Sequence, residues 1–387
     1  MVPIQYNLRN LVVRKATTVA TALGLALVVF VFSSVLMLSN GIKKTLGRGA
    51  ADDVAIVLRK GSDTELASGI DDSSVNIVLA AKELAAEGSA PRGVGEVVVV
   101  ILADKIGTDG FSNVLVRGVA DGSVAFRPTV KITQGRAATP GTDEVIVGKA
   151  IHGRFKGVKL GESFELKKNR PVKVVGIFED GGSSYESEVW GDLNLVRNAF
   201  GREGGVSGVR VRLASASKFD AFKTGIESNR QLDLEAFRES AYYDKQSQGL
   251  SIFISALGIC IAVFFSIGAM IGAMITMHAS VANRQREIGT LRALGFSKLA
   301  ILGSFLIESI ALGIVGGALG AGASLVMGLV RFSTMNWQTF SEVVFAFEPT
   351  GGIIGAALAL AAVMGLLGGF FPALRAARMS PIEAMRA

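Results

Sequence analysis

The sequence has few of the residues that build disulfides and metal sites. Among its 387 residues Cys260 is the one cysteine, which allows no intramolecular disulfide and leaves the redox compartment open. The two histidines, His152 and His278, are far apart in the sequence, and neither belongs to a cluster of carboxylates or thiols with metal-ligand spacing. The sequence therefore predicts no metal site.

Motifs for nucleotide binding and hydrolysis are also missing. The sequence contains no GxxxxGK(S/T) phosphate-binding loop, no GxSxG nucleophile elbow and no HExxH pair. Its carboxylates show no spacing that singles out an acid–base pair. We therefore predict no catalytic residue and no bound cofactor, so that any work on a substrate must draw its energy from elsewhere.

Charged residues are almost absent from four long apolar runs, at 16–42, 250–282, 299–330 and 349–374. Glu308 is the one Asp, Glu, Lys or Arg within them. A helix needs about 20 apolar residues to cross the hydrocarbon core of a bilayer, so each run is long enough to do so. The first run is longer than the roughly 7–15 apolar residues of a signal peptide, and we expect it to remain as an anchor.

The segment 43–249 alternates short apolar runs with charges and turns, which is typical of a water-exposed domain. Valine-rich strands are predicted at 95–105 and 206–215, a hairpin at 162–180, and a helix at 190–201 that Gly201 closes. The fold class is therefore an integral membrane α-helical protein of four transmembrane helices. A large extracytoplasmic α+β domain is inserted between the first and second of these helices.

The distribution of positive charge predicts the orientation in the membrane. The net charge is +7, and the basic excess lies in the N-terminal segment, in the loop around 284–298 and in the C-terminal tail. Because cytoplasmic loops are enriched in Lys and Arg, both termini and this loop are predicted to be cytoplasmic. The excess lies beside apolar spans rather than on a folded domain, so we expect no nucleic-acid partner.

The loop between the second and third runs contains a short basic amphipathic helix. Apolar residues recur at helical spacing in ANRQREIGTLRALGFS (282–297), and Gly295 follows the last of them, where a left-handed helix end is expected. Ser297 can then cap the next helix. A connector that only sets membrane orientation remains the alternative. The candidate residues are the charged Arg284, Arg286, Glu287 and Arg292, the apolar stripe Ile288, Leu291 and Leu294, and the helix end Gly295.

Three further features of the apolar runs carry predictions. Glu308 stands about one third into the third run, where an ionisable group is a functional hypothesis by default, although a structural hydrogen bond to a neighbouring helix is slightly favoured. The loop 331–348 contains five aromatic residues, as an outer interfacial belt would. Small-xxx-small spacing indicates close helix packing, within or between subunits, at Gly268/Gly272, Gly313/Gly317, Gly316/Gly320 and Gly365/Gly369.

Two cytoplasmic motifs resemble a known family. The segments RQREIGTLRALGFSKLAILGSFLIESIALGIVGGALG (284–320) and FPALRAARMSPIEAMR (371–386) resemble the permease subunits of MacB/FtsX-type (type VII) ABC transporters. The segments 7–27, 114–119 and 171–180 fit the same family. These 387 residues differ from MacB in containing no ATPase domain, so we expect a separate ATPase.

This resemblance implies partners and a role for the loop. The chain would be one permease subunit, working beside a second copy or a paralogue in the lipid bilayer. A cytoplasmic ABC ATPase dimer would bind ATP–Mg, and the coupling helix 284–295 would fit into a groove of that ATPase. The resemblance leaves open whether a periplasmic adaptor (membrane fusion) protein is a further partner. The inserted domain would have two lobes, one built from both ends of the insert and one from its middle.

The expected function is that of a permease of the bacterial cytoplasmic (inner) membrane that drives export or release of a lipoprotein, lipid, peptide or drug. The alternative is a signalling module that regulates a cell-wall enzyme without transport. The implied boundaries are an interfacial helix at 1–15, spans at 16–42, 250–280, 299–330 and 349–372, the inserted domain at 43–249, the coupling segment at 281–298, an outer loop at 331–348 and a tail at 373–387.

Overall fold

The computed structural model describes residues 15–86, 88 and 92–380, which form two compact units. Among the described residues, the first unit is helical and holds 15–40, 252–330 and 347–380, and the second holds those within 41–251 and 331–346. The expected interfacial helix at 1–15 falls almost wholly outside the described residues, as do residues 381–387 of the expected tail. In the described part of the chain four helices are long and apolar enough to cross a membrane. They are α2 (Lys15–Gly47), α7 (Glu239–Asn283), α9 (Lys298–Leu325) and α10 (Gly351–Arg378), with the short α8 (Gln285–Ala293) between α7 and α9.

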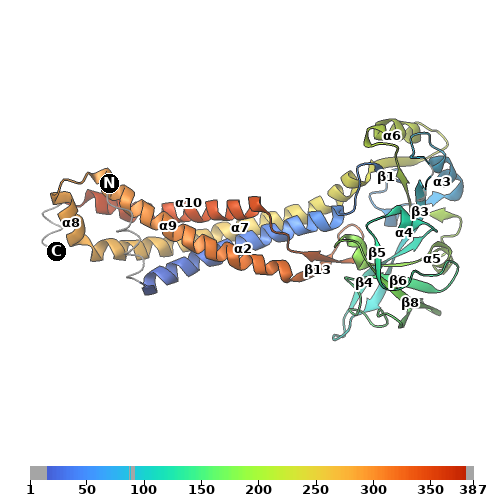
Figure 1. The fold of residues 1–387 in the computed structure, drawn as a ribbon, viewed down its shortest axis with the longest axis horizontal. Helices are drawn as coiled ribbons and strands as arrows, with labels where there is room; N and C mark the ends of the chain where they lie inside the picture. The colour runs from blue at the N-terminus through green and yellow to red at the C-terminus, as the bar shows by residue number, and fades with distance from the viewer. Residues whose placement is uncertain (1–14, 87, 89–91, 381–387) are drawn as a thin grey trace. The chain divides into compact units, whose positions relative to one another are not determined.

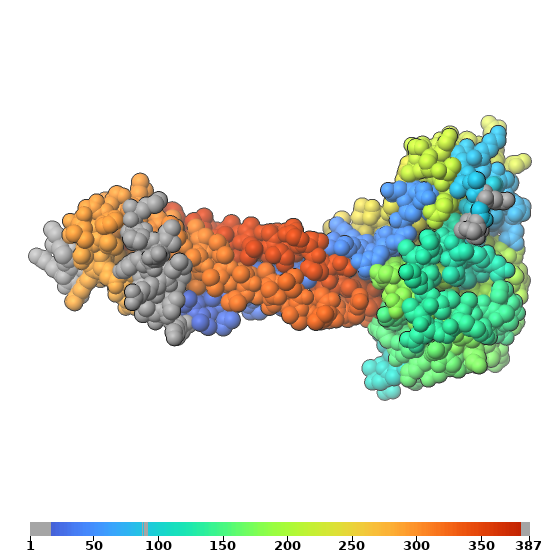
Figure 2. Space-filling model, viewed as in Figure 1, coloured from blue at the N-terminus to red at the C-terminus, as the bar shows by residue number. Residues whose placement is uncertain are grey.

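Helices α9 and α10 lie side by side because glycine and alanine line the faces that meet (Figures 1 and 2). A Cβ added at Gly313 would lie 2.5 Å from the carbonyl oxygen of Ala361, and one at Gly316 would lie 2.7 Å from that of Ala22 in α2. These distances allow no side chain, so small residues let the backbones approach. Three of the four predicted glycine pairs thus form contacts within the chain. Gly268 and Gly272 have no atom within 4 Å of an added Cβ.

The inserted domain is built on a ten-stranded sheet in the order β12-β1-β11-β3-β4-β9-β6-β8-β5, with β7 paired to β8. Its apolar core packs against α5 and α6, and Gly201 ends α5 in the left-handed conformation as predicted. The strands are β1 (Val54–Arg59), β2 (Ile70–Asp71), β3 (Gly93–Asp104), β4 (Phe111–Val119), β5 (Lys131–Gly135), β6 (Glu144–Gly148), β7 (Ser163–Lys167), β8 (Arg170–Glu179), β9 (Glu188–Asp192), β10 (Gly205–Val206), β11 (Gly208–Arg212) and β12 (Leu234–Arg238). The helices are α3 (Asp72–Leu79), α4 (Ser123–Phe126), α5 (Leu193–Phe200) and α6 (Phe219–Glu227), with 3-10 turns η1 (Glu65–Ala67), η2 (Ser184–Ser187) and η3 (Ala216–Lys218).

Strand β3 connects two parts of this sheet. Its beginning pairs with β11, next to β1 and β12, which come from the two ends of the insert. Its remainder pairs with β4, whose neighbours β9, β6 and β8 come from the middle of the insert. A single twelve-residue strand is therefore shared by both parts, and the sheet is continuous across them.

A cluster of buried charged side chains lies where β3 joins the two parts of the sheet. Arg117 on β4 binds both carboxylate oxygens of Glu188 on β9 at 2.8 Å, and Arg127 binds Glu96 on β3 with two bonds of 2.7 Å. Each pair is two-pronged, which is the strong geometry for guanidinium and carboxylate. The ionic cluster consists of Glu65, Glu96, Arg117, Arg127, Glu188, Arg210 and Glu239, all at most 7% exposed.

Arg210 joins this ionic cluster to the first turn of α7. Its guanidinium binds Glu65 at 2.7 and 2.9 Å, and its Nε lies 3.1 Å from an oxygen of Glu239, the first residue of α7. Tyr243, one turn further, accepts from the same guanidinium at 3.1 Å. The start of α7 is thus fixed to the sheet by charge as well as by packing.

The loop at 331–348 differs from the interfacial belt that the sequence suggested. It forms a hairpin of β13 (Arg331–Met335) and β14 (Glu342–Ala346), which follows the 3-10 turn η4 (Val326–Leu329). Phe345 is fully buried. The backbone N–H of Val344 donates to the side-chain oxygen of Ser187 in the inserted domain at 3.1 Å, so this backbone is bonded to the domain and does not face lipid. Arg154 binds Glu342 at 2.5 Å. The hairpin therefore packs as part of the inserted domain, although Trp337 and Phe340 remain half exposed.

The glycine contacts predict opposite effects for two neighbouring substitutions in α9. Gly316→Ala should lower the free energy of unfolding by about 1–3 kcal/mol, because its Cβ meets the backbone of α2. Gly322→Ala should raise the free energy of unfolding by up to about 1 kcal/mol, because a Cβ added at Gly322 has no neighbour within 4 Å and alanine favours the helix. Thermal unfolding of the detergent-solubilised chain measures both. Equal effects of the two substitutions would contradict this packing.

The ionic cluster predicts that the inserted domain is sensitive to acid. Burial alone would raise the pKa of Glu96, but the charges of Arg127, Arg117 and Arg210 outweigh it and lower the pKa to about 2, from 4.5. The same balance holds the pKa of Glu65 well below its usual range. A lowered pKa contributes stability that is complete above pH 4.5 and is lost as the pH falls towards 2.

Thermal unfolding between pH 7 and pH 2.5 tests this. The melting temperature should fall below pH 4.5, and Glu96→Gln should melt lower at pH 7 while losing part of the pH dependence. The matched control is Glu162→Gln at an exposed position, which should follow the unsubstituted protein at every pH. A melting temperature that stays constant down to pH 2.5 would refute the assignment.

Candidate functional site at the junction of α7, α8 and α9

The candidate site begins where α7 ends and the chain turns into α8. Arg284 interrupts the helix with φ −113° and ψ 16°, and α8 then runs for nine residues. At its end Gly295 has φ +93°, Phe296 N–H donates to the carbonyl of Leu291 at 3.1 Å, and Gly295 N–H donates to Arg292 at 3.2 Å. This is a Schellman ending, which requires a left-handed residue such as glycine. Ser297 then caps α9, since its side chain accepts from Ala300 N–H at 3.2 Å. Both features were predicted from the sequence.

The apolar side of α8 packs on the neighbouring helices. Ile288 is 1% exposed and lies in one cluster with Val281 of α7, Ile301 and Phe305 of α9, and alanines of α10. Leu291 is partly buried against the same cluster. Leu294, the third residue of the predicted apolar stripe, is 72% exposed. The stripe is thus divided into two inward residues and one outward residue.

A buried ion pair fixes the start of α8 to α9. Arg284 Nη1 lies 2.9 Å from Glu308 Oε2, and its Nε lies 3.0 Å from Glu287 Oε2 within α8. Arg284 and Glu308 are 6% and 5% exposed, and the guanidinium lies over the ring of Phe305 at 4.9 Å. The sequence slightly favoured a structural hydrogen bond to a neighbouring helix for Glu308, and the structure gives Glu308 a charged partner in Arg284, at the break between α7 and α8. The cation comes from the adjacent loop.

The remaining candidate residues divide by exposure. Arg286, Glu287 and Gly295 are exposed beside Leu294, whereas Arg292 is half-buried and donates to the carbonyl of Phe296 at 3.0 Å. The outward surface of α8 therefore combines charges of both signs with one large apolar side chain. A surface of this composition suits contact with another protein, because the exposed Leu294 at the end of α8 supplies apolar area.

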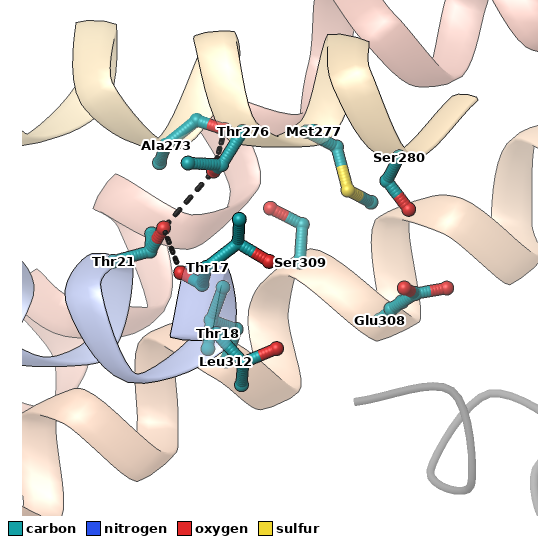
Figure 3. A pocket seen from close by; sticks show the side chains of 10 residues that line it. All are labelled: Thr17, Thr18, Thr21, Ala273, Thr276, Met277, Ser280, Glu308, Ser309 and Leu312. Atoms are coloured by element: carbon teal, nitrogen blue, oxygen red, sulfur yellow. Dashed lines mark hydrogen bonds between the residues drawn. The ribbon is translucent and has the colours of Figure 1, made fainter. Parts of the chain in front are cut away.

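A small polar cavity lies beside the ion pair (Figure 3). It has a volume of about 40 Å³, room for one or two water molecules, and Glu308 is one of its walls. Among its lining residues, the hydroxyl of Thr21 in α2 donates to that of Thr276 in α7 at 3.0 Å. Hydroxyl groups in a membrane span need partners, and here they find them on adjacent helices. Sequence reasoning did not find this cavity, because its threonines and serines come from three separate helices.

Two family models match the chain and together cover most of it. The FtsX-like permease C-terminal model matches residues 259–381, and the MacB-like periplasmic core domain model matches residues 17–229. Four membrane-crossing helices with this domain after the first of them define an ABC transporter permease. The chain belongs to the MacB/FtsX-like permease family, and it is a multi-pass membrane protein.

Curated relatives agree with this assignment. The macrolide export ATP-binding/permease protein MacB of Shewanella sp. (strain W3-18-1) is 31% identical over 231 residues, which cover 56% of this chain and 34% of that protein. The chain thus spans about a third of the length of this relative. The uncharacterized ABC transporter permease YknZ of Bacillus subtilis (strain 168) is 28% identical over 70% of this chain and 69% of that one. The solved extracellular domain of a YknZ from Gram-positive bacteria has a TM-score of 0.35 and 17% identity, covering 48% of this chain and 99% of that one.

The Arg284–Glu308 pair predicts a strong coupling between two substitutions. Arg284→Met leaves a buried carboxylate without its cation and should lower the free energy of unfolding by about 3–5 kcal/mol. Glu308→Gln should also lower the free energy of unfolding, because it leaves the buried guanidinium of Arg284 without the carboxylate of Glu308. The double variant should lose less than the sum of the two single losses, because it leaves no buried charge unpaired.

Thermal unfolding of all four proteins in one detergent measures the coupling. Arg286→Met, two residues away on the exposed side, is the matched control and should change stability by less than about 0.5 kcal/mol. Additive losses in the cycle would show that the two side chains do not interact.

Proposed function

We propose that this chain is the permease subunit of an ABC transporter complex whose ATPase lies outside these 387 residues, on a separate cytoplasmic dimer that binds ATP–Mg. Helix α8 is the coupling helix that receives the movement of that ATPase. One observation carries this proposal: α8 is fixed inwardly by Arg284 and Ile288 while Arg286, Glu287 and Leu294 remain exposed.

To receive a force, α8 must be held firmly by the neighbouring helices on one side and be accessible to the ATPase on the other. The Schellman ending and the Ser297 cap limit movement at one end of α8, and the ion pair to α9 limits it at the other. A force applied to the exposed side therefore moves α8 together with α7 and α9 rather than bending a loop. Helix α7 is continuous from Glu239 to Asn283, so its movement is passed to the ionic cluster at its first turn.

The proposed output is a mechanical movement of the inserted domain on the extracytoplasmic side of a bacterial inner membrane, with both termini cytoplasmic. This movement drives export or release of an envelope substrate, such as a lipoprotein, lipid, peptide or drug. A second copy of the chain or a paralogue completes the permease, and a periplasmic adaptor is a candidate partner. The MacB relative is a macrolide export ATP-binding/permease protein, which supports export.

The alternative is a signalling module that regulates a cell-wall enzyme without transport. The same coupling helix and continuous α7 would serve it, since neither requires a substrate path. The large insert with two sheet parts favours the transport function.

The proposal predicts which substitutions in α8 separate folding from coupling. Arg286→Glu and Leu294→Asp should each reduce recovery of the ATPase with the affinity-tagged chain at least tenfold, because they change the exposed contact surface. Their melting temperatures should remain within about 2 °C of the unsubstituted chain, since neither side chain is buried. The matched controls are Arg230→Glu and Leu102→Asp, at exposed positions of the inserted domain.

The measurement is affinity purification from solubilised native membranes, with mass spectrometry of the recovered proteins and assay of their ATPase activity. An ATPase recovered with an adaptor supports export, and one recovered with a cell-wall hydrolase or its activator supports the signalling alternative. Full ATPase recovery with both α8 variants would refute the assignment of α8 as the coupling helix.

A further inference from the structure

A second cavity lies within the inserted domain, next to the first residue of α7. Its volume is about 150 Å³, and it lies between the segment that precedes β1, the turn after α4, and η2. Asp180 and Glu239 are two of its walls, and Arg127, Thr129 and Tyr185 are others. A cavity of this volume holds a molecule of about six heavy atoms, since an engineered cavity of similar size accommodates benzene.

Asp180 is a buried carboxylate with one oxygen unused. It is 2% exposed, and its Oδ2 accepts from the hydroxyl of Ser183 at 2.5 Å. Its Oδ1 has no hydrogen-bond partner among the described residues, where no ion pair to Asp180 is found either. The nearby N–H groups of Asp180 and Gly182 both donate to Glu186 instead, at 2.8 and 2.6 Å. A buried carboxylate oxygen without a donor is costly, so the site is incomplete as it stands.

Arg127, another residue that lines the cavity, offers one unused donor. Both terminal nitrogens of Arg127 bind Glu96, but its buried Nε has no partner in the described part of the chain. Arg212, which also borders the cavity, is occupied by Asp53 at 2.8 Å and by the carbonyl of Phe126 at 3.2 Å. The ring of Tyr185 supplies an aromatic wall. The cavity thus offers a charged acceptor at Asp180 and a charged donor at Arg127.

We propose that this cavity binds a small primary ammonium compound that also carries an oxygen acceptor, of the size of an amino alcohol. Its ammonium group donates to Asp180 Oδ1, which supplies the missing cation, and its oxygen accepts from Arg127 Nε. A neutral molecule would leave the carboxylate uncompensated, and an anion would face both Asp180 and Glu239. The bound ligand would lie against Glu239 and therefore against the ionic cluster that fixes the start of α7.

The test uses the full chain in maltoside detergent and ethanolamine as the probe. Isothermal titration should show saturable binding of ethanolamine, whereas ethylene glycol, which replaces the ammonium by a hydroxyl, and glycolate, which is an anion, should bind at least tenfold more weakly. Asp180→Asn, which keeps the shape and an oxygen for Ser183, should weaken ethanolamine binding at least tenfold. Asp233→Asn is the matched control at a side chain that is 71% exposed, and it should bind like the unsubstituted chain.

A second variant makes the test independent of any loss of folding. A Cβ added at Gly49 would lie 3.3 Å from Asp180 Oδ2 and 3.9 Å from the hydroxyl of Thr129, so these two side chains border the same space. Thr129→Lys places a tethered ammonium there, at an exposed backbone position. It should raise the melting temperature and abolish ethanolamine binding. Absence of saturable ethanolamine binding would show that the cavity holds only water, and equal binding of ethylene glycol would show that no ammonium group is required. Either result would overturn the proposal.

Discussion

The ion pair between Arg284 and Glu308 determines how the helical unit can work. A carboxylate inside a membrane-crossing helix costs several kcal/mol unless it is paired, so Glu308 requires a cation nearby. Arg284 supplies it from the residue at which α7 stops being helical, and α8 is thereby held against α9. Without this pair, Ile288 and the half-buried Leu291 would carry the attachment of a nine-residue helix by themselves. Helices that short are not stable in isolation, so α8 depends on its contacts.

In the ionic cluster of the inserted domain, too, each buried charge requires a partner, but here seven side chains are involved. Four glutamates and three arginines share bonds there, and each arginine has at least one two-pronged carboxylate partner. Buried pairs of this kind add little net stability over apolar packing, but removal of one partner is costly. Such a cluster therefore fixes geometry more than it adds stability. It selects one arrangement of β3, β4, β9 and β11 around the first turn of α7, because any other arrangement would leave a charge unpaired.

Sequence reasoning predicted local features well and long-range partners poorly. The four apolar helices, the Gly295 ending and the Ser297 cap follow from composition and short spacing, and all are present. The partner of Glu308 is 24 residues away, and its approach depends on α8 turning back along α9, which no local pattern specifies. The hairpin at 331–346 was missed for a related reason. Aromatic residues suit a membrane interface and a buried sheet equally, and only the pairing of β13 with β14 and the burial of Phe345 decide between them.

The division of α8 into an inward and an outward side explains why its charged residues cannot be treated as one group. Arg284 and Arg286 are only two positions apart, yet Arg284 is 6% exposed and Arg286 is exposed. One is neutralised by Glu308 in an apolar surrounding, and the other lies in solvent. Under the proposed coupling role, loss of ATPase recovery after a change at Arg284 would therefore report a loosened helix, whereas loss after a change at Arg286 would report a lost contact. The two mechanisms differ in stability, since only the first leaves a buried charge without its partner.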